Sequence, residues 1–115
     1  MGAVSRAGSQ EKIALLEAAR AAIAATLRSA SLDSAARVLG EVPPAGVEGW
    51  ASVWIASLGV ARAAAERWRV TVGAAERRAL DRKEREEFAQ LGRDLAAVEQ
   101  VTLALIATII GTLDS

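Results

Sequence analysis

Residues 101–113 read VTLALIATIIGTL, thirteen positions without a charge that end just before Asp114 and Ser115. The stretch continues a pattern in which apolar or small residues recur at alternating spacings of three and four. The residues on this pattern are Phe88, Leu91, Leu95, Val98, Thr102, Leu105, Ile109 and Thr112. Such spacing is typical of a helix that turns one face toward a core. We therefore expect one helix over about 82–113, with residues 101–113 as its last turns.

Two other interpretations of residues 101–113 are weaker. Seven of the thirteen residues are β-branched, which favours a strand locally, but no partner strand is evident elsewhere. As a helix, the stretch rises only about 20 Å, whereas a hydrocarbon core is about 30 Å thick. We expect no transmembrane span, while attachment to a membrane interface stays open as an alternative.

A second helix is predicted over about 46–80, because a similar pattern precedes the charged middle of the chain. Its members are Trp54, Leu58, Ala61, Ala65, Trp68, Val72 and Ala75. Asp81 and Glu84 have the spacing of a capping box, which predicts a turn between the two helices. An antiparallel hairpin places the uncharged residues 49–61 beside residues 101–113. Residues 76–100, with 13 of the 28 charges, then form its solvated end.

The N-terminal part predicts two further helices. The segment QEKIALLEAARAAIAATLRSA is rich in strong helix formers and predicts a helix over about 10–30. Ser31 has the character of an N-cap for a short helix over about 32–39. Residues 40–49 form a Pro/Gly linker, and residues 1–8 are expected to be flexible. The prediction is a single all-α domain over 1–115, a helical bundle built on a long antiparallel helical hairpin.

The C-terminal stretch carries a second apolar row, which needs a covering neighbour. Exposed Ile and Leu side chains forgo about 1.5–3 kcal/mol each. We expect the chain to be a homo-oligomer or to bind a helical protein partner through the uncharged end of its hairpin. The residues expected at that interface are Trp50, Trp54, Ile55, Ile106, Ile109, Ile110 and Leu113. The predicted function is therefore a non-enzymatic assembly or scaffold subunit, for which the Ala- and Arg-rich composition suggests a bacterial or phage source.

The composition excludes most catalytic chemistry. The chain has neither Cys nor His, so it has no cysteine nucleophile, no Ser-His-Asp triad and no ordinary zinc site. Asp81, Glu84 and Glu87 share one helix face, which leaves a Mg²⁺-dependent phosphohydrolase as a remote alternative. We expect no enzyme activity, no metal, no cofactor and no small-molecule substrate.

The charge pattern and the N-terminal segment give no sign of a specific partner or of a targeting signal. Fourteen basic and fourteen acidic residues cancel, and the basic residues of 77–85 are interleaved with acids, so we expect no nucleic-acid partner. Glu99 interrupts the apolar run; it is expected to pair with an arginine, with a buried functional carboxylate as the alternative. The first residues lack a secretory pattern, so the expected location is the cytoplasm or an assembled particle, with leaderless secretion left open.

The residues VEGWASVW, at 47–54, follow a turn between two predicted helices. This layout resembles the small helical-hairpin substrates of actinobacterial type VII secretion, the WXG100 class. The resemblance implies a small secreted or membrane-peripheral helical hairpin, which we keep as an alternative function. The chain departs from that class because it has no Trp-x-Gly motif, and without a tyrosine it has no Tyr-x-x-x-Asp secretion signal.

Overall fold

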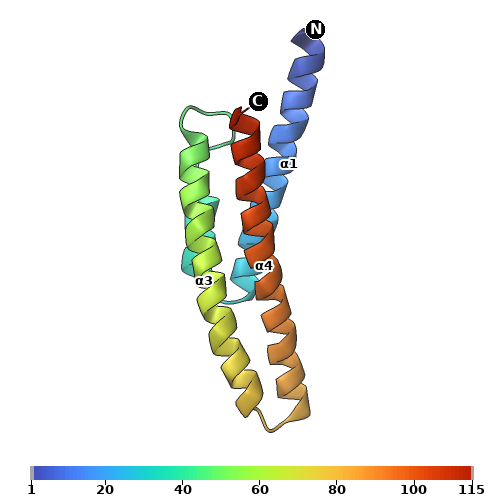
Figure 1. Ribbon diagram of the computed structural model, residues 1–115, viewed down its shortest axis with the longest axis vertical. Coiled ribbons are helices and arrows are strands. Elements are labelled where there is room, and N and C mark those ends of the chain that lie inside the picture. Colours follow the sequence, from blue (N-terminus) through green and yellow to red (C-terminus); the bar gives the residue numbers. More distant parts are fainter. Residues whose placement is uncertain (1, 115) are drawn as a thin grey trace.

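The computed structural model describes the backbone of residues 2–114 and the side chains of residues 10–113. Four helices follow one another: α1 (Gly2–Ser29), α2 (Asp33–Gly40), α3 (Trp50–Arg78) and α4 (Arg82–Asp114) (Figure 1). No strand occurs among the described residues, so the all-α prediction is confirmed. The molecule is long and narrow, measuring 62 × 22 × 20 Å.

Helices α3 and α4 form an antiparallel hairpin that runs the length of the molecule (Figure 1). The turn is closed locally: the Lys83 backbone N–H donates to Asp81 Oδ1 at 3.3 Å, and Arg85 Nη2 donates to the Ala79 carbonyl at 2.9 Å. Residues 49–61 and 101–113 lie beside each other at the opposite end. We call residues 49–65 and 95–113 the base of the hairpin, and residues 66–94 its tip.

The two N-terminal helices cover only the base. Helix α1 packs on α2 and α4, and α2 packs on α3, so the four helices form a ring in cross-section. In Figure 1, α1 runs beside the C-terminal half of α4 and extends past its end, while the tip consists of α3 and α4 alone. The base is therefore a four-helix bundle and the tip is a bare helical pair.

The core follows the two predicted seams. Fully buried side chains on these seams are Trp54, Leu58, Ala61 and Ala65 of α3, and Leu95, Thr102 and Ile109 of α4. Helices α1 and α2 contribute Leu27, Ala36 and Leu39, which are equally buried. The Thr102 hydroxyl donates to the Val98 and Glu99 carbonyls, both at 2.9 Å, so its burial leaves no unpaired donor. The alternating spacing thus predicted the inward face of the hairpin correctly.

The helix boundaries differ from the expected ones at several places. Helix α1 begins at Gly2 rather than near residue 10, and α3 begins at Trp50 rather than near residue 46. The N-cap of α2 is Leu32, not Ser31, which instead has a left-handed φ of 64°. The expected flexibility of residues 1–8 falls on side chains outside the described part and stays a prediction.

The linker turns sharply because two glycines take conformations that other residues rarely adopt. Gly46 and Gly49 have φ values of 97° and 77°. A Cβ added at Gly46 would also lie 3.4 Å from Ile13 Cδ1 of α1. These turns bring Pro43 close to α3, where its carbonyl accepts a 2.7 Å hydrogen bond from Trp54 Nε1. The linker is thus fastened to the base.

Candidate protein-interaction face

The outward side of α4 at the base is exposed and carries no charge. We call its exposed residues between 100 and 113 the base face. They are Gln100, Val101, Leu103, Ala104, Ala107, Thr108, Ile110, Gly111 and Leu113. The large aliphatic side chains among them are 45–59% exposed. Folding of one copy therefore leaves about half of each of these side chains in contact with water.

Helix α1 extends this uncharged surface because its two central charges are turned toward the linker. Glu17 Oε1 accepts the backbone N–H of Ala45 at 3.0 Å, and Glu17 Oε2 accepts Arg20 Nη2 at 2.6 Å. Arg20 also donates to the Leu39 carbonyl at 3.2 Å and stacks 5.4 Å from the centre of the Trp54 ring. No other charge lies between Lys12 and Arg28, so the outer side of α1 consists of alanines and Leu15.

The same network sets the ionisation of Glu17. Partial burial raises the pKa of this carboxyl, but the Ala45 N–H and the Arg20 guanidinium outweigh it, so the pKa lies below its ordinary value. Glu17 is therefore ionised at neutral pH and holds the linker against α1. This contact joins residues 28 positions apart, and no pattern in the sequence predicts it.

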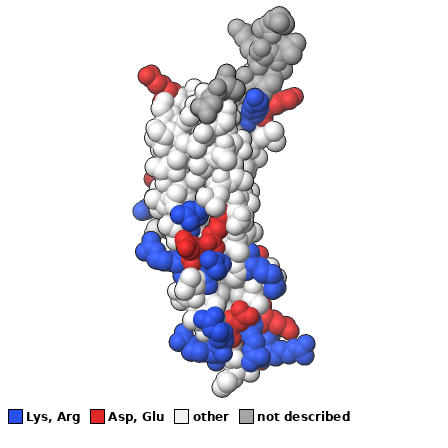
Figure 2. Space-filling view, in the orientation of Figure 1, with Lys and Arg blue, Asp and Glu red and all other residues white. Residues whose placement is uncertain are grey.

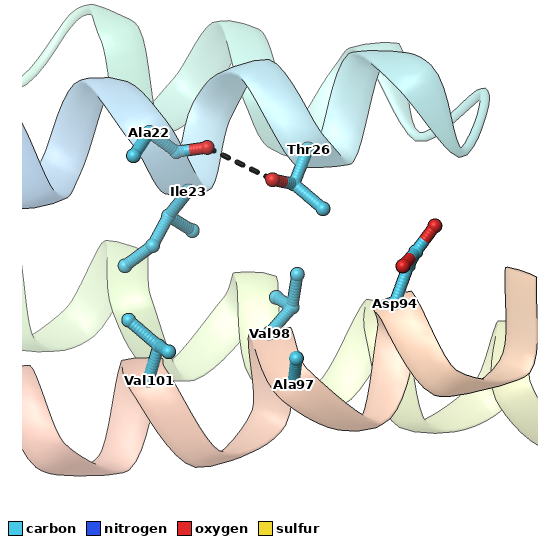
Figure 3. A pocket seen from close by; sticks show the side chains of 7 residues that line it. All are labelled: Ala22, Ile23, Thr26, Asp94, Ala97, Val98 and Val101. Carbon is cyan, nitrogen blue, oxygen red and sulfur yellow. Dashed lines mark hydrogen bonds between the residues drawn. The ribbon is translucent and has the colours of Figure 1, made fainter. Parts of the chain in front are cut away.

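Two hollows follow one another between α1 and α4 along the base, and we call them together the groove. Its wider part, about 460 Å³, is lined by Lys12, Leu15, Leu16, Ala19, Leu105, Thr108, Gly111 and Thr112. Its narrower part, about 210 Å³, is shown in Figure 3, where Ala22, Ile23 and Thr26 of α1 face Ala97, Val98 and Val101 of α4. Asp94 lies at the end of this narrower part. The groove is thus apolar along its length, with Lys12 near one end and Asp94 at the other.

The tip has the opposite character. Figure 2 shows Lys, Arg, Asp and Glu gathered over the half of the molecule near the turn, while the ends of α3 and α4 at the base are nearly free of charge. Arg82 pairs with Glu86 at 3.2 Å, both largely exposed. Leu80, 96% exposed, is isolated at the turn. Such interleaved charges keep the tip in water and contribute little to stability.

The base and tip meet at an ion pair between the hairpin helices. Arg69 Nε donates to Glu99 Oε2 at 2.5 Å, and Arg69 Nη2 donates to Glu99 Oε1 at 3.3 Å. The carboxylate raises the pKa of the Arg69 guanidinium, chiefly through these hydrogen bonds. The Glu99 side chain is 14% exposed and that of Arg69 is 40% exposed. Glu99 therefore has the arginine partner that its position in the sequence led us to expect.

The structure separates the seven residues expected at an interface into three groups. Trp54 and Ile109 are completely buried inside the chain and are removed from the set, because a partner cannot reach them without unfolding the base. Trp50, Ile55 and Ile106 are half-buried against the core. Ile110 and Leu113 are 47% and 59% exposed, respectively, and belong to the base face. Leu103, which belongs to the second apolar row of the sequence but was not among the seven, is 48% exposed there.

The carboxylates of Asp81, Glu84 and Glu87 do not form a metal site in this structure. Among the described residues, no group of three or more Asp, Glu, His or Cys side chains is placed to hold a metal ion. Asp81 instead caps α4. All three side chains are exposed to solvent.

Helix α4 is long and apolar enough to cross a membrane by length and composition alone. Residues 101–113 alone are too short to span a membrane, whereas a longer, 18-residue window of α4 meets the hydropathy and charge limits for a span. Of that window, 28% is buried inside the molecule. A single such helix is weak evidence, since core helices of soluble proteins pass the same test. The expected absence of a span therefore stays a prediction.

Comparison of the chain with protein-family models, curated proteins and solved structures finds no match.

Proposed function

We propose that the protein is a non-enzymatic assembly or scaffold subunit that binds a helical protein surface, either a second copy or another protein, through its base face. The observation that carries the proposal is the character of this face. It is uncharged, exposed and continuous with the outer side of α1 across an apolar groove. Contiguous exposed apolar surfaces of this kind mark interaction sites, whereas single scattered apolar residues do not.

Three aliphatic side chains of the base face lose contact with water when a partner covers them. Leu103, Ile110 and Leu113 are 48%, 47% and 59% exposed. Covering the exposed half of each contributes about 1 kcal/mol per residue. A helix laid along the face would also cover the alanines between them. The three side chains together contribute about 3 kcal/mol, less than the about 4–15 kcal/mol that association costs, so Val101, the alanines and the groove lining must supply the remainder.

The hairpin tip fits the role of an arm rather than a second contact surface. Basic and acidic residues are interleaved along the start of α4, and the Arg82–Glu86 ion pair there is highly exposed. Such a surface stays solvated, so the tip adds no apolar area through which molecules could associate non-specifically. In such a scaffold subunit the apolar base binds the partner and the charged tip stays in water.

Sedimentation velocity on three proteins tests the proposal. The wild-type chain is expected to sediment as a multiple of its 12.0 kDa mass at micromolar concentration. Val101→Glu places a charge on the groove side of the base face, where Val101 is 45% exposed, and should shift the protein to monomer. Val70→Glu is the matched control, because Val70 is 60% exposed on the tip, and its mass should equal that of the wild type.

Two results would count against the proposal. The first is a wild-type protein that stays strictly monomeric at high micromolar concentration and binds no helical protein. The second is an assembly that Val70→Glu disrupts as much as Val101→Glu does. Circular dichroism of both variants checks that each keeps the helical content of the wild type.

A membrane-peripheral role is the second candidate. It is favoured because α4 contains an 18-residue apolar window of which only 28% is buried inside the molecule. In that case the base face enters a lipid interface rather than a protein one. Flotation with phosphatidylcholine vesicles separates the two functions. Vesicle binding by the wild-type protein that is lost in Ile110→Glu, together with a monomer in solution, would favour the membrane role.

A further inference from the structure

The groove between α1 and α4 has a charge pattern that its apolar lining does not require. Lys12 lines its wider part and Asp94 its narrower part, and the wall between them is uncharged. Among the described residues, Lys12 takes part in no ion pair, and Asp94 accepts only a 3.0 Å hydrogen bond from the neutral Gln90. In Figure 3 the Asp94 carboxylate lies at the end of the groove, beyond Thr26. One positive and one negative group thus stand at opposite ends without a charged partner.

We propose that α4 of a second copy occupies this groove, antiparallel to the first α4 and related to it by a two-fold axis. The inference rests on the proposed function and names its partner. Lys12 lies beside Gly111 and Thr112, about as far to one side of residues 101–104 as Asp94 lies to the other. A two-fold axis that crosses α4 near residues 101–104 therefore places each Lys12 beside Asp94 of the other copy. Two ion pairs form at once.

The alternatives fail this charge test. A parallel pair would set Lys12 beside Lys12 and Asp94 beside Asp94, which is repulsive at both ends. A lipid surface would gain nothing from opposite charges at the two ends of a groove. The formal net charge of zero also means that two copies do not repel each other as whole molecules. Charge complementarity therefore selects the antiparallel copy.

The register of α4 agrees with the same axis. Its exposed positions on the groove side recur at 94, 97, 101, 104, 108 and 111, with spacings of three and four. This series is symmetric about its centre, so turning it end for end brings it onto itself. Ala97 then faces Thr108 of the other copy, and Val101 faces Ala104. These side chains are small enough for the helix axes to approach to about 8 Å, the close end of the usual range.

The available surface matches the need of a dimer. From residue 94 to residue 112 the groove is about 27 Å long, and α1 with α4 is about 20 Å wide. The projected area of this surface is roughly 500 Å². Because protruding side chains make the accessible area larger than the projection, it approaches the ~800 Å² per partner of a stable interface.

Cysteine cross-linking tests the arrangement, because the natural chain contains no cysteine. Ala97→Cys and Thr108→Cys each replace an exposed residue. After mild oxidation, a mixture of the two variants is expected to form the mixed dimer. Each variant alone is expected to form little, because identical positions lie about 16 Å apart along the antiparallel pair. Dimers formed by each variant alone, with no preference for the mixture, would overturn the antiparallel arrangement.

Charge reversal provides a second measurement that does not depend on disulfide geometry. Lys12→Asp or Asp94→Lys alone turns two attractive contacts into two repulsive ones, and should weaken the dimer about tenfold. The double variant Lys12→Asp/Asp94→Lys should restore wild-type affinity, measured by sedimentation equilibrium at low salt. Failure of the double variant to restore it would overturn the inference.

The failures of the two proposals can be told apart. If the protein associates but the mixed cross-link and the charge rescue are both absent, the base face binds a partner in another geometry and only the inference falls. If the protein is monomeric and binds no helical protein, both fall. A monomer that floats with vesicles assigns the base face to lipid.

Discussion

The tryptophans of α3 differ in what their indole N–H groups meet. Trp54 donates to the Pro43 carbonyl at 2.7 Å, and Trp50 packs edge-on against it with ring centres 5.3 Å apart. The Trp68 N–H is buried but has no acceptor among the described residues. An unpaired buried donor costs about 1–3 kcal/mol, so the two rings contribute unequally to stability.

Replacing each ring by phenylalanine separates these contributions. Trp54→Phe removes a hydrogen bond and leaves the Pro43 carbonyl short of a donor, so we expect a loss of about 1–3 kcal/mol beyond the loss of ring volume. Trp68→Phe removes the same ring atoms together with an unpaired donor, and its effect should be near zero. Urea denaturation followed by circular dichroism measures both. Equal losses in the two variants would contradict the assignment of hydrogen-bond partners.

Glu17 makes the stability of the base depend on pH. Its pKa in the folded state lies below the ordinary value of 4.5, so the folded protein binds this proton less readily than the unfolded chain. The stabilisation is therefore present above about pH 4.5 and is lost as the pH falls through the lower, folded-state pKa. Glu17→Gln should be less stable than the wild type at pH 7, with the difference shrinking in acid. A difference that grows as the pH falls would contradict the sign.

At the level of the elements, Arg69 and Glu99 join α3 to α4 where the base gives way to the tip. The Glu99 carboxylate is much less exposed than the Arg69 guanidinium. Removing the arginine therefore leaves a largely buried charge without a partner, whereas removing the carboxylate leaves a guanidinium that water can reach.

The two single substitutions should consequently differ. Arg69→Met is expected to destabilise the fold more than Glu99→Gln does, although less than the loss of a fully buried pair would, because water reaches the guanidinium. Glu99→Gln is expected to cost less than about 1 kcal/mol. Thermal and urea unfolding of both variants, with the double variant to close the cycle, measures the difference. Equal costs would show that the pair acts as an exposed salt bridge.

The four helices could be predicted from the sequence because their signals are local. The alternating spacing of three and four marks the buried sides of α3 and α4, and the prolines and glycines of 40–49 mark the linker. The ends were less predictable. Ser31 is a favourable N-cap by residue type, yet the chain places Leu32 there, because tertiary packing of α2 decides the boundary.

The candidate interface was predictable only in part, for a similar reason. Trp54 and Ile109 lie on the seams, and the helical period alone places them in the core. Which flank of α4 stays open depends on where α1 docks, and this in turn depends on the linker contact between Glu17 and Ala45. Contacts between residues so far apart leave no trace in a single sequence.

At the scale of the whole molecule, the unequal division of the core predicts unequal local stability. The base has four helices around Trp54, Leu58 and Ile109, whereas the tip buries little more than Val72 and Ala79. Amide protection follows the free energy of local opening, which falls where few apolar contacts must be broken. We expect amides in 70–78 and 82–92 to exchange at least about tenfold faster than those in 54–61 and 102–109. Hydrogen exchange followed by mass spectrometry measures this directly.

Val101→Glu distinguishes the two sources of protection at the base. Trp54, Leu58 and Ile109 are fully buried within one copy, so a monomeric variant should keep the difference between base and tip. Association should add protection to residues 101–113 in the wild type, and that part alone should disappear on dilution or in the variant. If the base of the variant exchanged as fast as the tip, the four-helix end would owe its order to the partner. The chain would then be a subunit that folds only as it assembles.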